Sequence, residues 1–350
     1  MKRSVGEKRD GKMEIRIGCV RSVFLSALLS IMVCTSGYSQ GIEFSKPKLY
    51  GNIKAKYEYA TDPGMSRFSV RNSRLGLTGE ISEWISYKGQ VDLSNEGRFS
   101  VLDLNISMRL LEGLSLTLGQ MSIPLFNSYT VTPGELLFAN RPFIGKYFAS
   151  TRELGAIVAY KTGWDTFPVS VEFGLFNGGT INNPIWTNEP SYATRLQLGG
   201  MTGFRFTAKY YDYPFSAIED YTFWGVDARY ADTNYKIETE VMNRYNDFDG
   251  TNRVSSYIQG AYVFQLRNPG LVRNIIPALR WDSIGESLGN GMFDNNRLTL
   301  GLSFGLTDKP FGSLFRIDYE HYMTDNPIPE FLTGREIASD KITFEILIVF

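Results

Sequence analysis

The last ten residues of the chain, KITFEILIVF, constrain its fold more than any other stretch. Every second position is apolar: Ile342, Phe344, Ile346, Ile348 and Phe350. Strict alternation of this kind is typical of a β-strand with one face buried against apolar material. A soluble β-sandwich could use such a strand. A closed membrane barrel would in addition explain why the last strand ends on an aromatic residue, Phe350.

The same alternation recurs upstream and predicts sixteen strands, an even number, as a closed single-chain bacterial barrel requires. In KLYGNIKAKYEYA, apolar and aromatic residues share one face and charged residues share the other. The predicted strands are 48–60, 66–81, 84–93, 100–110, 114–121, 152–161, 166–175, 191–198, 203–211, 221–230, 235–245, 253–265, 274–283, 296–306, 313–322 and 341–350.

The connections between these strands alternate between short and long. Short connections such as 111–113 and 199–202 alternate with long ones such as 122–151 and 323–340. Outer-membrane barrels have this asymmetry, with the short turns on the periplasmic side. The sequence therefore predicts an all-β fold, a 16-stranded antiparallel transmembrane β-barrel of the outer-membrane porin type.

Residues 1–40 have a different character. A basic region precedes the apolar run VFLSALLSIMVC, and the small and polar residues TSGYSQ follow it. This order is typical of a secretory signal peptide. We expect residues 1–40 to be removed near Ser39 or Gln40, with Met13 as an alternative start, and residues 41–350 to form the barrel. Cys34 raises the alternative of a lipoprotein anchor.

Composition argues against several classes of function. Both cysteines, Cys19 and Cys34, precede residue 41, so we expect no disulfide, thiolate nucleophile or thiolate metal site in the exported part. The one histidine, His321, lies on an apolar strand face, and no cofactor or metal-ligand motif is present. Beyond residue 40 acidic residues outnumber basic ones, which argues against nucleic acid as a partner. We therefore expect neither an enzyme nor a cofactor.

A barrel of this size encloses an aqueous lumen, so inward charged residues are candidate pore-lining and anion-binding groups. The phase of alternation shifts between Val70 and Leu75, which predicts a bulge and leaves the facing of two arginines open. For any single inward charge, a salt-bridged ladder between strands is the alternative role. The candidate residues are Arg71, Arg74, Lys88, Arg109, Arg141, Lys146 and Arg152.

The long connection 122–151 is the best candidate for a functional loop. It lacks periodicity but is rich in apolar residues, among them Leu125, Phe138 and Phe143, which require a surface to pack on. The inner wall of the barrel offers one, and a loop folded inward would narrow the pore. Its slightly basic charge would favour anions at a constriction. The alternative is an external cap.

Three runs resemble the phosphate-selective porin O and P family: SVRNSRLGLTGEISEWISYKGQVDLS, LDLNISMRL and LSLTLGQMSIPL. Arg71 and Arg74 match the arginine-rich second strand of that family. Gly119, Gln120 and Pro124 match its entry into the third extracellular loop. The resemblance covers residues 48–150 and implies a trimeric sixteen-stranded channel with an inward-folded third loop.

The expected function is an outer-membrane porin. It would pass small hydrophilic solutes by diffusion, with an anion or phosphate preference. Its expected partners are small anions or other hydrophilic solutes, outer-membrane lipid and two further copies of the chain. The alternative is a non-conducting outer-membrane barrel that binds or adheres to ligands through its long loops.

Overall fold

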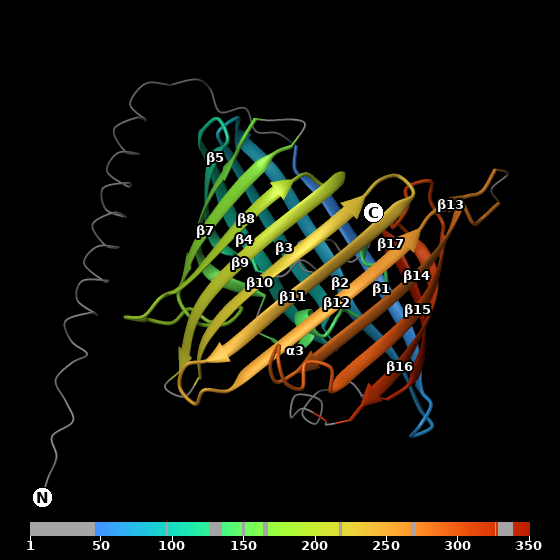
Figure 1. The fold of residues 1–350 in the computed structure, drawn as a ribbon. Coiled ribbons are helices and arrows are strands. Elements are labelled where there is room, and N and C mark those ends of the chain that lie inside the picture. Colours follow the sequence, from blue (N-terminus) through green and yellow to red (C-terminus); the bar gives the residue numbers. More distant parts are fainter. Residues whose placement is uncertain are drawn as a thin grey trace, which may run out of the picture. The chain divides into compact units, whose positions relative to one another are not determined.

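The computed structural model describes residues 46–95, 97–125, 135–148, 151–163, 167–216, 219–267, 270–325, 327 and 339–350. The predicted signal peptide lies outside the described residues, and so does the middle of the long connection, 126–134. Within the described residues, strands dominate, and one four-residue helix, α3 (Ile144–Tyr147), interrupts the long connection (Figure 1). No helix in this part of the chain is long and apolar enough to cross a membrane.

The strands follow one another along the chain with few interruptions. Their bounds are β1 (Lys48–Ala60), β2 (Met65–Ser82), β3 (Ile85–Asn95), β4 (Arg98–Leu111), β5 (Leu114–Ser122), β6 (Arg152–Lys161), β7 (Val169–Phe176), β8 (Ser191–Gly199), β9 (Gly203–Ser216), β10 (Glu219–Ala231), β11 (Tyr235–Asn246), β12 (Asn252–Tyr262), β13 (Phe264–Gln265), β14 (Asn274–Gly285), β15 (Asn295–Gly305), β16 (Leu314–Thr324) and β17 (Lys341–Val349).

Each strand pairs antiparallel with its neighbour, and β1 pairs with β17, which closes the sheet. The short β13 continues β12 beyond Val263, since both pair with β14. Sixteen strands therefore build the wall, and the predicted closed antiparallel barrel is confirmed. At the seam, Phe350 N donates to Gly51 O at 3.0 Å and Gly51 N donates to Phe350 O at 2.9 Å.

The polarity of the barrel is inverted relative to a soluble protein. On β17, Phe344, Ile346 and Ile348 are 38%, 52% and 40% exposed, whereas Thr343 and Glu345 are buried. Exposed apolar side chains recur on the outward positions of the other strands, including Ile53, Leu104, Ile258 and Leu300. In soluble proteins, charged residues are rarely buried unless they are paired. A polar interior with an apolar exterior is typical of a membrane barrel.

The connections divide the barrel into two ends. The strand ends that flank 83–84, 112–113 and 232–234, for example, form the short-turn end, and those that flank 123–151, 177–190 and 325–340 form the long-loop end. The predicted bulge lies in β2, where the register shifts on both sides of Ser73 and Asn72 has a φ of 57°. Because the bulge inserts an extra residue, Arg71 and Arg74 both lie on the inward side, and Arg74 is buried.

Candidate functional site: the lumen and its loop

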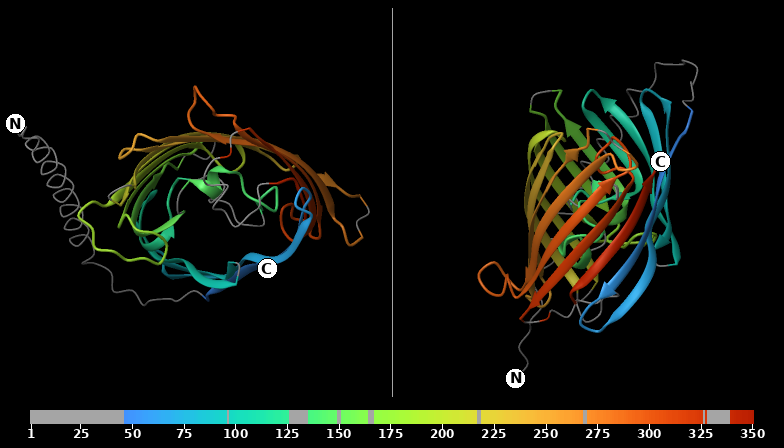
Figure 2. Two further views of the ribbon diagram at one scale, coloured as in Figure 1. Left: turned by 90° about the horizontal axis from the view of Figure 1, so that it is seen from below. Right: turned by 90° about the vertical axis from the view of Figure 1, so that its right-hand side faces the viewer.

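The described parts of the long connection lie among inward-facing side chains of the barrel. In Figure 2, the end-on view shows the segment that contains α3 (green) inside the ring of strands. Leu125, Phe138 and Phe143 are almost completely buried. Because the whole connection between β5 and β6 starts and ends at the long-loop end, these residues descend into the lumen from that end.

One sector of the wall, formed by β14 to β17 and β1, holds the loop through its backbone carbonyls. We name it the anchoring sector. Four cationic side chains donate to four carbonyl oxygens of the segment 136–141. The contacts are Arg316 Nη1 to Leu136 O (2.9 Å), Lys54 Nζ to Ala139 O (2.7 Å), Arg280 Nη1 to Asn140 O (2.9 Å) and Arg297 Nη2 to Arg141 O (2.8 Å).

Two carboxylates of the same sector accept hydrogen bonds from backbone amides of the loop. Asp318 Oδ2 accepts from Ala139 N at 2.7 Å, and Asp282 Oδ2 accepts from Phe143 N at 3.0 Å. Hydrogen bonds to charged groups are stronger than those between neutral groups. The sector thus fixes the path of the loop backbone independently of most of the loop side chains.

The charges of the anchoring sector also pair with one another. Glu345 lies 2.8 Å from Lys54 Nζ and 3.0 Å from Arg316 Nε, and Arg297 lies 2.6 Å from Asp282 and 2.9 Å from Glu320. These side chains are at most 2% exposed. These cations therefore have the alternative role of salt-bridged groups in the barrel wall. They bind neighbouring carboxylates and carbonyl oxygens of the loop.

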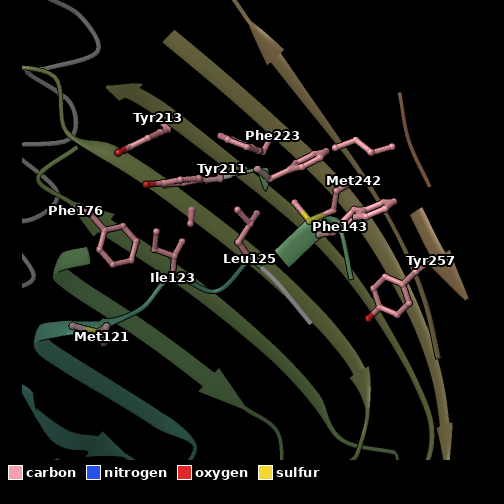
Figure 3. Close-up of a cluster of buried hydrophobic side chains, with 14 residues drawn as sticks. Met121, Ile123, Leu125, Phe143, Phe176, Tyr211, Tyr213, Phe223, Met242 and Tyr257 are labelled. Carbon is pink, nitrogen blue, oxygen red and sulfur yellow. The ribbon is translucent and has the colours of Figure 1, made fainter. Parts of the chain in front are cut away.

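A second sector, β7 to β12, contacts the loop mainly through apolar side chains, although Lys236 and Arg244 of β11 also donate to Glu135 O and Phe148 O. Figure 3 shows Ile123, Leu125 and Phe143 facing Tyr211, Phe223 and Met242. Each of these side chains is at most 3% exposed, and burial of an apolar side chain of this size stabilises by about 1.5–3 kcal/mol. The loop is therefore held between a charged and an apolar sector.

The first residues of the connection 177–190 contact inward-facing side chains and the end of β5, whereas residues 182–190 are exposed. Gln120 Nε2 donates to Asn182 Oδ1 at 3.0 Å, and Asn182 N donates to Gln120 Oε1 at 2.7 Å. Gly179 N and the Tyr211 hydroxyl donate to Glu153 at 2.7 and 2.8 Å. Gln120 belongs to the run that resembles a loop entry, and it joins the connection 177–190 to the barrel wall at β4 and β5.

The remaining sector, β2 to β6, carries most of the predicted site residues; we name it the basic sector. Asp103 lies at its centre, 2.8 Å from Lys88 Nζ and 2.8 Å from Arg152 Nε. The Lys88 side chain is 45% exposed, whereas the cations of the anchoring sector are almost fully buried. Water therefore reaches charged groups of the basic sector.

Three arginines surround a second carboxylate in this sector. Asp92 lies within electrostatic reach of Arg71, Arg74 and Arg152. Arg74 is in turn close enough to Arg141, on the loop, and to Arg152 for like-charge repulsion to act on its guanidinium group. Basic groups thus outnumber carboxylates where the loop faces β2 and β6.

The structure brings five of the predicted residues together and separates two. Arg71, Arg74, Lys88 and Arg152 lie around Asp92 and Asp103, and Arg141 of the loop lies near Arg74. Arg109 is exposed and lies near the short-turn end of β4, opposite Ser115. Lys146 belongs to α3, and its side chain lies outside the described part of the structure.

Sequence reasoning missed the anchoring role of Lys54, Arg280, Arg297 and Arg316. Alternation indicates that such residues face inward, but their carbonyl partners lie in an irregular loop far away in sequence. It also missed Gln120 and Asn182 as a pair. Among the described residues, no group of three or more His, Cys, Asp or Glu side chains is placed to hold a metal ion.

Comparison with known proteins gives similarity in structure but not in sequence. No protein-family model matches the chain, and no curated protein matches it either. The anion-selective porin from Comamonas acidovorans superposes with a TM-score of 0.61 and 13% identity, over 88% of this chain and 100% of that one. The fold is that of outer-membrane porins.

Two further porin-like structures support the same fold. The Salmonella typhi OmpF complex with daunomycin has a TM-score of 0.60 and 14% identity, over 90% of this chain and 99% of that one. The outer membrane channel DcaP of Acinetobacter baumannii has a TM-score of 0.55 and 12% identity, over 89% and 100%. At these identities the likeness concerns the fold alone.

Proposed function

We propose that the chain is an outer-membrane porin that lets small hydrophilic solutes diffuse through a water-filled lumen. The observation that carries this proposal is the closed barrel with an apolar exterior, a charged interior and a loop held inside it. A barrel of sixteen strands is wide enough for an aqueous channel. In the bacterial outer membrane, the short turns would face the periplasm and the long loops the exterior.

The solute path runs between the loop and the basic sector. The other two sectors bind the loop, by charge at β14 to β1 and by apolar packing at β7 to β12. The side chain of Lys88, by contrast, is 45% exposed. Solutes would therefore pass Lys88 and the half-buried Arg71, and the buried Arg74 and Arg152 would act on them through their charge.

The channel would favour anions. Four basic wall residues lie around the carboxylates of Asp92 and Asp103, and Arg141 of the loop lies near Arg74, which gives this side of the lumen a net positive charge. The sign of the charge at a constriction biases the ions that pass. The resemblance to the phosphate-selective porin O and P family, together with the arginines, makes phosphate the anion to test first, because guanidinium groups bind phosphate in bidentate geometry. The same resemblance makes a homotrimer the expected assembly.

Single-channel recording in a planar bilayer tests this function. We expect stepwise conductance and a smaller current when phosphate is added. In a KCl gradient, the reversal potential should shift towards the equilibrium potential of chloride. Conductance without selectivity or block would leave a general pore. Folded protein that inserts but does not conduct would contradict the porin function and favour a barrel that binds ligands through its long loops.

A further inference from the structure

The outer surface of the barrel has two depressions over the same strands, β10 and β11, which lie side by side (Figure 1). Most of the residues that line them face outward, and the inward-facing Thr207, Asp227 and Glu240 also border the first one. Both depressions therefore open towards the surroundings of the barrel and not towards the lumen. One is apolar and lies nearer the middle of the strands. The other has a mixed lining of aromatic and polar side chains and lies at the long-loop end.

The first depression, named here the outer groove, has a volume of about 340 Å³. The small side chains of Ala208 and Ala228 line it together with the larger apolar side chains of Leu196, Phe206, Val226 and Val241. Phe206 and Val226 are 48% and 52% exposed. An apolar outer groove of this kind can bind a hydrocarbon chain, because burial of apolar surface is favourable.

The second depression, named here the rim pocket, has a volume of about 530 Å³. Trp224, Asn243, Tyr245, Asp247 and Asn252 line it, and residues 287–289 of the connection between β14 and β15 cover one side. Thr222 Oγ1 donates to Asp247 Oδ2 at 2.7 Å. No lysine or arginine is among the described residues that line the pocket.

The strand register connects the two depressions. Trp224 pairs with Asn243 above the pair Val226–Val241, and all four side chains point outward. Two residues along a strand span about 6.8 Å. One molecule with a polar head and an apolar tail can therefore occupy the rim pocket and the outer groove together, with its tail pointing towards the middle of the barrel wall.

We propose that this composite site binds one sugar-headed lipid of the outer leaflet. Sugar hydroxyls can donate to the Asp247 carboxylate and exchange hydrogen bonds with the amides of Asn243 and Asn252, and a sugar ring can stack on Trp224. A phosphate head would face Asp247 without a cation to offset its charge. The leaflet assignment rests on the proposed outer-membrane location, but the site is independent of conduction through the lumen.

Native mass spectrometry of the intact barrel, held in a polyoxyethylene detergent, tests the site. The probe is dodecyl maltoside, and dodecylphosphocholine has the same chain length with a charged phosphate head. We expect one dodecyl maltoside to bind in preference to dodecylphosphocholine. Ala228→Phe, which fills the outer groove, and Trp224→Leu should each weaken binding about tenfold, which corresponds to about 1.4 kcal/mol.

Ala55→Phe is the matched control, because Ala55 is an exposed, outward alanine on β1, away from both depressions. It should leave binding unchanged. Equal binding of both detergents, equal weakening by Ala55→Phe, or a loss of oligomer instead of lipid in Ala228→Phe would overturn the proposal. Conductance of the same proteins separates the two proposals: a barrel that conducts but binds no sugar lipid contradicts only this one.

Discussion

The ring of Phe138 lies directly over Gly301 of β15, so that a Cβ atom at residue 301 would come within 2.9 Å of Phe138 Cε1. The guanidinium carbon of Arg280 lies 4.7 Å from the centre of the same ring. Glycine at this inward position thus leaves the space that the loop requires to approach the wall.

Replacing Gly301 with valine should displace the loop. The added side chain would overlap Phe138 and the Asp318 carboxylate, which itself accepts a hydrogen bond from the loop. We expect a loss of stability of about 1–3 kcal/mol and a larger single-channel conductance. Gly260→Val is the control, because the nearest atom to a Cβ there is 3.6 Å away. Unchanged conductance in Gly301→Val would show that the loop does not limit the current.

Glu345 is the shared partner of two buried cations and should be essential for stability. In the original protein, the Glu345 carboxylate lies 2.8 Å from Lys54 Nζ and 3.0 Å from Arg316 Nε. Glu345→Gln removes this shared negative charge. Breaking a buried pair costs about 3–5 kcal/mol. The free energy of unfolding by urea in lipid vesicles measures the effect. Asp308→Asn, which breaks an exposed pair with Arg273 at 3.9 Å, should cost less than about 1 kcal/mol. Similar losses in both variants would contradict this account.

Asp340 should contribute a pH-dependent part of the stability. It lies just before β17 and accepts hydrogen bonds from His321 Nδ1 at 2.6 Å, the Tyr319 hydroxyl at 2.9 Å and Tyr322 N at 2.7 Å. Partial burial opposes its ionisation, but these hydrogen bonds outweigh burial and lower its pKa. Because the folded pKa is depressed, this stability is present above the unfolded pKa of about 3.9 and is lost as the pH falls through the folded pKa.

Asp340→Asn should therefore flatten the acid side of the stability profile. Unfolding free energies measured from pH 6 down to about pH 2 provide the test. The variant should be less stable than the original protein near pH 6, and the difference should shrink as the pH falls. A difference that stays constant, or grows, on acidification would show that the Asp340 carboxylate is not the group that titrates.

The strand pattern of this barrel is predictable because its physical cause is local. A membrane barrel alternates lipid-facing and lumen-facing residues at every second position, so residues such as Phe344 and Glu345 reveal their facing from the sequence. The bulge in β2 is also visible, as a phase shift. The pairing of β1 with β17, for example Tyr57 with Phe344, follows once closure is assumed.

The candidate site is less predictable because its contacts join distant segments. Arg280 and Lys88 are both inward cations in an alternating strand, yet one holds a loop carbonyl and is almost fully buried while the other is 45% exposed beside Asp103. Strand periodicity contains no information about the path of the irregular loop, so it cannot separate these two roles. Arg109 illustrates the same limit. It is predicted to face inward, and it does, but it lies near the short-turn end, away from the other basic residues.

In the proposed channel, solutes pass the basic sector and not the anchoring sector. The chain from residue 41 onward contains no cysteine, so single cysteines can be introduced without a background. Lys88→Cys places a thiol on the basic sector, and Thr299→Cys places one on the anchoring sector, where residue 299 is fully buried. A negatively charged methanethiosulfonate reagent is then added to open channels in a planar bilayer.

We expect the reagent to modify the cysteine at position 88 during the recording. The modification should lower the single-channel current and shift the reversal potential towards the equilibrium potential of the cation. The cysteine at position 299 should stay unmodified and its channel unchanged. Rapid modification at position 299 with no effect at position 88 would contradict the account, because the solute path would then run along the anchoring sector.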